Sequence, residues 1–102
     1  MERWVRVAAP DACPPGSVLE CVAEDRVVAL FNVDGQFHAL EGLCPHQGGP
    51  LGKGRLEGHV VTCPWHGWQF DVTTGINLVM PAAKLETYPV TVAGDEIRVD
   101  LP

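Results

Sequence analysis

Apolar and polar residues alternate in short stretches along this chain, and Gly, Pro, Asp or Asn residues separate the stretches. A two-residue period of this kind predicts half-buried β-strands. No stretch keeps a helical apolar period beyond about two turns, although residues 81–85 could form a single turn. We therefore expect an all-β fold, built as a sandwich or barrel.

The expected strands cover residues 4–7, 17–22, 26–33, 36–40, 55–62, 68–71, 86–92 and 96–100, with 9–16 as a loop. Asp34-Gly35 separates two apolar stretches and predicts a hairpin with a primed turn, which matches the strand twist. Residues 55–62 are expected to fold back on themselves as a second hairpin, with its turn at Glu57-Gly58. Ala93-Gly94-Asp95 marks the turn of a closing hairpin.

Composition limits the function classes. A chain of 102 residues fits one small domain, spanning 1–102. Its seven basic and thirteen acidic residues give a net charge of −6, which argues against nucleic acid and anionic membrane surfaces as partners. No apolar run approaches the ~20 residues of a membrane span. Because the first residues also lack the apolar stretch of a signal peptide, we expect a cytoplasmic protein.

The acidity is unevenly distributed. Residues 1–41 carry seven acids and three bases (−4), and residues 81–102 carry four and two (−2). Residues 42–80 carry two of each and sum to zero. The charges either keep a small protein in solution or steer an acidic carrier toward basic partner surfaces.

Two Cys/His pairs lie within this neutral segment. Cys44-Pro45-His46 and Cys63-Pro64-Trp65-His66 are separated by sixteen residues. Two thiolates and two imidazoles can bind zinc or iron. Since the 55–62 hairpin goes out and returns, we expect it to bring both loops to one end of the molecule.

The other cysteines and histidines carry weaker signals. Cys13 and Cys21 have no histidine pattern nearby, and buried structural thiols are the expected role. His38 and His59 lie on predicted hairpins with no cysteine two or three residues away, so we expect ordinary structural or surface histidines.

Cys44-Pro45-His46-Gln47-Gly48-Gly49-Pro50-Leu51 and Cys63-Pro64-Trp65-His66-Gly67-Trp68-Gln69-Phe70 resemble the two cluster-binding boxes of Rieske proteins. The resemblance implies three antiparallel sheets and a cluster-binding lobe at about residues 42–80. It also implies one [2Fe–2S] cluster, with Cys44 and Cys63 on one iron and His46 and His66 on the other. The size resembles the Rieske-type ferredoxins of bacterial ring-hydroxylating dioxygenase systems.

The resemblance also assigns roles around the cluster. Gly48, Gly49 and Gly67 are expected to adopt positive φ and to let backbone amides approach the sulfides. Met80-Pro81-Ala82 is the best match for a third, proline-containing loop that shields the cluster in this family. An apolar tip for brief partner docking is expected to comprise residues Trp65, Pro50, Leu51 and Pro81.

Departures from the respiratory Rieske pattern predict a low-potential centre. Gly49 and Trp65 stand where respiratory members carry the cysteines of a disulfide. Trp68 and Phe70 stand where those members carry a serine and a tyrosine, whose hydroxyls donate hydrogen bonds to sulfur. Losing such bonds lowers the reduction potential toward the bottom of the Rieske range of roughly −150 to +300 mV.

The resulting functional prediction is a monomeric, non-enzymatic one-electron carrier between a flavin-dependent reductase and a terminal oxygenase. The alternative within the same chemistry is an electron-entry subunit of a larger enzyme, such as the small subunit of a nitrite reductase. A third reading is a binding module in which the same Cys and His residues hold one structural Zn²⁺.

Overall fold

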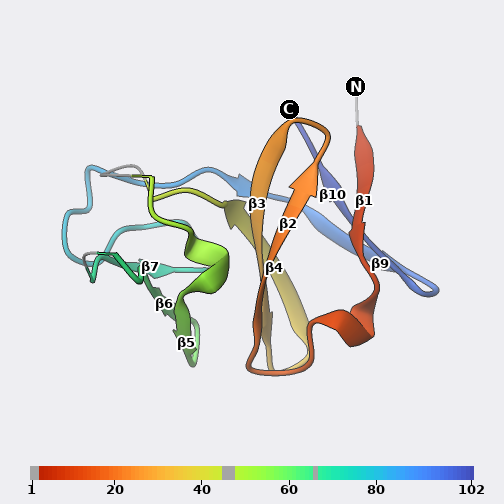
Figure 1. Cartoon of the computed structure of the whole chain (residues 1–102), viewed down its shortest axis with the longest axis horizontal. Coiled ribbons are helices and arrows are strands. Elements are labelled where there is room, and N and C mark those ends of the chain that lie inside the picture. The colour runs from red at the N-terminus through yellow and green to blue at the C-terminus, as the bar shows by residue number, and fades with distance from the viewer. Residues whose placement is uncertain (1–2, 45–47, 66) are drawn as a thin grey trace.

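The computed structural model describes residues 3–44, 48–65 and 67–102, and these residues form ten β-strands and two short 3-10 turns. The strands make three antiparallel sheets, which confirms the all-β prediction (Figure 1). In the described ranges, no helix is long and apolar enough to span a membrane.

Two of the three sheets combine strands that are distant in the chain, and the third is built from consecutive strands. The first has the order β1-β10-β9, formed by Trp4–Ala8, Glu96–Asp100 and Val90–Ala93. The second has the order β2-β3-β4-β8, formed by Val18–Ala23, Arg26–Val33, Gln36–Glu41 and Thr87–Tyr88. The third has the order β5-β6-β7, formed by Arg55–Glu57, Val60–Thr62 and Gln69–Asp71, and it projects to one side of the other two (Figure 1).

Strand β3 lies between two hydrophobic cores. Val28 and Leu30 pack into a first core with side chains of β10, whereas Ala29 and Phe31 pack into a second core. Successive side chains of a strand point to opposite faces, so a strand that is covered on both faces needs a continuous apolar run. The stretch from Val28 to Phe31 supplies that run, with no exposed surface.

The two predicted internal hairpins are present. Between β3 and β4, Asp34 and Gly35 have φ of 52° and 91°, as a primed turn requires. Between β5 and β6, Glu57 pairs with Val60, which moves the turn one residue beyond its predicted place, to Gly58-His59. Gly58 supplies the positive φ of 61° at that turn.

Residues 86–92 do not form the single strand that the sequence predicts. Proline has no amide proton for the ladder, and Pro89 divides the segment into β8, which pairs with β4, and β9, which pairs with β10. The predicted loop 9–16 contains a 3-10 turn, η1 (Pro10–Ala12). Residues 81–85 contain a hydrogen-bonded turn, in which the Ala83 amide donates to the Met80 carbonyl at 2.9 Å, and no helix.

Candidate metal centre

Two loops with the same backbone hydrogen bonding carry the predicted cysteine ligands. The Cys44 amide donates to the carbonyl of Gly49 at 2.8 Å, and the Cys63 amide donates to the carbonyl of Trp68, also at 2.8 Å. Each bond joins two residues that are five positions apart in the sequence. The local sequences differ, yet each cysteine is the first residue of a loop that is closed by the same backbone hydrogen bond.

A glycine closes each loop. The Gly48 amide donates to the Cys44 carbonyl at 2.7 Å, and the Gly67 amide donates to the Cys63 carbonyl at 3.1 Å. Their φ angles of 72° and 77° lie in the left-handed region, which side chains with a Cβ avoid. The positive φ predicted for these two glycines is confirmed.

Gly49 has a different role from the one that the sequence predicts. It is absent from the glycines with positive φ, and a Cβ at this position would lie 2.7 Å from Sγ of Cys63 and 3.2 Å from the ring of Trp65. Gly49 is therefore required because the first loop packs directly on the second. The expectation that the hairpin brings the two loops together is confirmed for the described residues, with Arg55 paired to Thr62 at the hairpin's base.

Both cysteines are buried in the second core. Cys44 is 0% exposed and Cys63 is 1% exposed, and they share this core with Phe70 of β7. The other two predicted ligands, His46 and His66, lie outside the described residues, as do Pro45 and Gln47.

Leu51 is also buried in this core, with no exposed surface, so its predicted place at the docking tip is wrong. It begins the 3-10 turn η2 (Leu51–Lys53), which packs on β2. The contact is so close that a Cβ on Gly52 would lie 2.5 Å from the Cα of Glu20.

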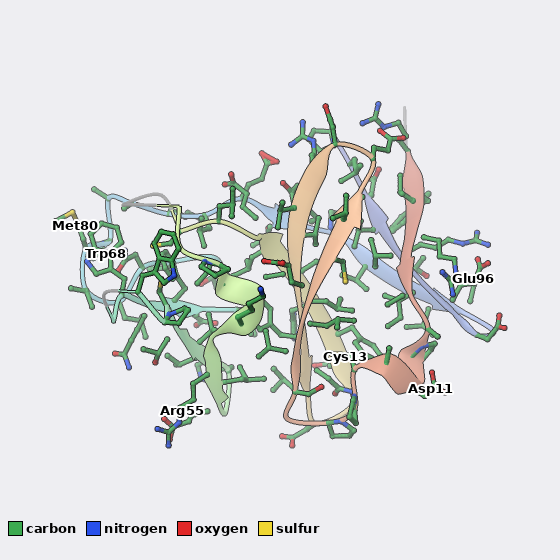
Figure 2. All side chains as sticks on the ribbon, in the orientation of Figure 1. Asp11, Cys13, Arg55, Trp68, Met80 and Glu96 are labelled. Atoms are coloured by element: carbon green, nitrogen blue, oxygen red, sulfur yellow. The ribbon has the colours of Figure 1, made fainter. Side chains whose placement is uncertain are left out.

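A third loop lies beside the second cysteine loop. The Leu78 amide donates to the carbonyl of Gln69 at 2.7 Å. Oδ1 of Asn77 accepts hydrogen bonds from the amides of Val79 (2.8 Å) and Met80 (2.9 Å), which sets the direction of the chain into Met80-Pro81-Ala82. Figure 2 shows Met80 and Trp68 at the same end of the molecule. Asn77 is a functional residue that the sequence-based expectations did not include, although an Asn two residues after a Gly-containing turn is a typical loop organiser.

The same end of the molecule exposes apolar side chains. Trp65 is 61% exposed, and Leu78, Val79 and Met80 are each at least half exposed. We call these four residues and the exposed Pro81 the apolar tip. Arg55 and Glu57 pair with each other at 3.3 Å on β5, and Figure 2 shows Arg55 well away from Met80. The tip expected from the sequence does not include Leu78 and Val79. The apolar run 78–80, which lies outside any expected strand, could have indicated them.

The remaining histidines and cysteines lie elsewhere. Nδ1 of His59 lies 3.3 Å from Oδ1 of Asp71. Burial lowers the pKa of His38, and the negative charge of Asp71 offsets part of this effect. Cys13 and Cys21 are buried in the first core, where burial raises the pKa of Cys21 to about 11. Within the described part of the chain, no three His, Cys, Asp or Glu side chains gather at a metal-binding distance.

Comparison with known proteins identifies the family. Residues 3–89 match the family described as Rieske [2Fe-2S] domain. The ferredoxin component of the naphthalene 1,2-dioxygenase system of Pseudomonas aeruginosa is 37% identical over 101 residues, which cover 98% of this chain and 97% of that protein.

Solved structures agree with this assignment. A chain in the complex of reduced oxygenase and oxidised ferredoxin in carbazole 1,9a-dioxygenase superposes with a TM-score of 0.86 at 32% identity, covering 95% of this chain and 92% of that chain. A putative NADH-dependent nitrite reductase small subunit from Mycobacterium tuberculosis superposes with a TM-score of 0.89 at 26% identity, covering 100% and 97%. The chain belongs to the family of Rieske [2Fe–2S] domains.

Proposed function

We propose that this protein is a one-electron carrier that receives electrons from a reductase and delivers them to a terminal oxygenase. The observation that carries the proposal is the pair of matching loops, which hold two buried cysteines in one core and meet at Gly49 and Cys63. Homologues at this level of identity are ferredoxin components of dioxygenase systems. We further propose that the carrier is a cytoplasmic monomer.

The residues present fit a Rieske cluster. Two buried thiol side chains share one core, their loops are closed by matching backbone hydrogen bonds, and two histidines lie beside them in the sequence. We propose Cys44 and Cys63 as ligands of one iron, and His46 and His66 as ligands of the other. When bound, the cluster supplies reversible one-electron transfer. Gly48 and Gly67 close the loops, and the absent Cβ of Gly49 leaves room for the Cys63 sulfur.

The apolar tip is the surface that we propose for docking. Electron-transfer encounters bury small interfaces, so that the partners separate quickly. Side chains such as Trp65 and Val79 supply apolar contact area next to the cysteine loops. The acidic residues outside 42–80 then guide the approach to basic surfaces on the reductase and the oxygenase.

The nitrite reductase small subunit is the second candidate, because a protein of that description shares the fold over its full length. Size-exclusion chromatography of the native protein from its own cells separates the two functions. A carrier elutes at the mass of one 11.0 kDa chain, whereas a subunit elutes in a permanent complex.

Substitution of the ligands tests the proposed centre. Cys44→Ala, Cys63→Ala, His46→Ala and His66→Ala should each abolish the visible and electron paramagnetic resonance spectra of the native protein. Cys21→Ala and His59→Ala are matched controls, because Cys21 lies in the other core and His59 is paired with Asp71, and both variants should keep the spectra. A colourless wild-type protein with one Zn²⁺ and no acid-labile sulfide would instead establish the zinc module.

A further inference from the structure

Two buried asparagines in this protein differ in how their side-chain amides are used. Asn32 is 3% exposed, and its Nδ2 donates to the Cys13 carbonyl at 2.8 Å while its Oδ1 accepts from the Gly35 amide at 2.7 Å. Asn77 has no exposed surface, and its Oδ1 accepts two backbone hydrogen bonds in the third loop. Its Nδ2 is the one buried side-chain nitrogen or oxygen in the described ranges that has no hydrogen-bond partner.

The backbone bridge between Asn77 and Phe70 places the Asn77 side chain on the same face as a core neighbour of the cysteines. Asn77 forms an isolated antiparallel bridge with Phe70. Residues directly opposite each other in such a bridge carry their side chains on the same face. Phe70 packs in the second core together with Cys44 and Cys63. Asn77 therefore presents its unused donor on the face of the lobe that carries the predicted cysteine ligands.

A buried amide donor without a partner is costly. Leaving such a group unsatisfied destabilises a protein, and native structures rarely keep one without a reason. Cysteine sulfur and inorganic sulfide are acceptors that a bound cluster adds to this face. The positions where respiratory Rieske proteins supply hydroxyl donors to sulfur hold Trp68 and Phe70 here, so an amide from the segment bridged to β7 would act where those hydroxyls are missing.

We propose that Nδ2 of Asn77 donates a hydrogen bond to a sulfur of the bound cluster and thereby raises its reduction potential. This inference rests on the proposed [2Fe–2S] centre and adds a hydrogen-bond donor to it. Reduction places additional negative charge on the sulfurs, so the donor stabilises the reduced state more than the oxidised state. Oδ1 of the same side chain accepts the amides of Val79 and Met80 in the third loop. Asn77 therefore connects the reduction potential of the cluster with the position of these two tip residues.

The test compares midpoint potentials of purified, cluster-loaded variants. Asn77→Leu removes the donor without adding charge and should lower the midpoint. Asn77→Asp keeps an acceptor for the two loop amides but loses the donor, and it should lower the midpoint further because it adds negative charge. Asn32→Leu is the matched control, since it removes a buried asparagine whose amide is already satisfied; it should lower the thermal stability and leave the midpoint unchanged.

Two results would overturn the inference. One is a wild-type midpoint in the loaded Asn77→Leu and Asn77→Asp proteins, and the other is an equal shift in Asn32→Leu. Either result leaves the cluster itself in place and so differs from failure of the proposed function, in which the wild-type protein shows no iron–sulfur spectrum at all. If Asn77→Leu fails to fold, Asn77→Asp still tests the inference, because that variant retains the loop hydrogen bonds: a midpoint at or above that of the wild type, despite the added charge, overturns it.

Discussion

A Cβ atom on Gly49 would lie 2.7 Å from Sγ of Cys63, well inside the distance that real Cβ atoms keep from sulfur. The ring of Trp65 approaches the same point to 3.2 Å. The two cysteine loops thus touch at a residue that has no side chain. The contact fixes how far apart the loops stand, and therefore the spacing of the proposed ligands.

We predict that Gly49→Ala reduces the amount of cluster bound. The added methyl group must displace the Cys63 sulfur or push the loops apart, and overpacking of this kind costs about 1–3 kcal/mol. The measurement is iron and acid-labile sulfide per protein, together with the visible spectrum. Gly58→Ala is the control for an added methyl group that meets no neighbour: unlike Gly49, Gly58 has a positive φ (61°), but its Cβ would meet no atom within 4 Å. Full occupancy in Gly49→Ala would contradict the prediction.

The elements that could be predicted from the sequence are those with local causes. Asp34-Gly35 determines its own turn, since both residues tolerate positive φ, and the β3–β4 hairpin follows from it. The two cysteine loops are equally local, because each closes on itself through one glycine. Short-range chemistry was sufficient for both.

The errors arise where long-range packing decides. The sequence predicts one strand over residues 86–92. In the structure, β4 pairs with the first part of this segment and β10 with the second, and Pro89 is the one local signal that marks the boundary. Leu51 reads as a surface residue in a Gly- and Pro-rich loop. Leu51 is buried because η2 packs on β2, and this contact joins residues about thirty positions apart in the sequence.

A second prediction concerns the apolar tip. Val79→Ser should slow electron delivery to an oxygenase about fivefold, because the partner loses roughly 1 kcal/mol of apolar contact. The midpoint potential should stay the same, since the change introduces no charge. The measurement is the rate at which reduced protein is oxidised by the oxygenase component of a naphthalene 1,2-dioxygenase system.

Val22→Ser is the matched control for this experiment. Val22 is 66% exposed on β2, against 57% for Val79, and lies outside the tip. Equal slowing by both variants would mean that the tip has no special part in docking.

A third prediction follows from the carboxylate of Asp71. Burial is the largest single influence and acts to raise its pKa. The hydroxyl and amide of Thr73, which donate to Oδ1 at 2.6 Å and 2.9 Å, and the neighbouring His59 together outweigh burial and hold the pKa below its ordinary value. A carboxyl whose folded-state pKa is lowered stabilises the fold above its unfolded-state pKa of about 3.9, and this stabilisation is lost as the pH falls through the folded-state value.

Thr73→Val keeps the side-chain shape and removes the hydroxyl. The free energy of unfolding should fall by about 1 kcal/mol at neutral pH, and the difference from wild type should shrink once the pH drops below about 4. Urea unfolding at several pH values measures the difference, and the NMR resonance of the Asp71 carboxyl carbon reports its pKa, which should rise. Thr91→Val, on the exposed part of β9, is the control. A pH-independent difference would exclude the carboxylate as its cause.

The last prediction concerns Phe70, which is completely buried in the core that holds Cys44 and Cys63. Phe70→Tyr adds a hydroxyl at the position where respiratory Rieske proteins donate to a ligand sulfur. A hydrogen bond that favours the reduced state by about 1 kcal/mol raises a one-electron midpoint by about 40 mV, so the Phe70→Tyr midpoint should rise by roughly that amount. Phe37→Tyr makes the same change in the first core and should leave the midpoint where it is. A rise in Phe70→Tyr alone would mean that the predicted low potential comes from missing donors at the sulfur; equal midpoints in both variants would mean that a hydroxyl at this position does not set the potential.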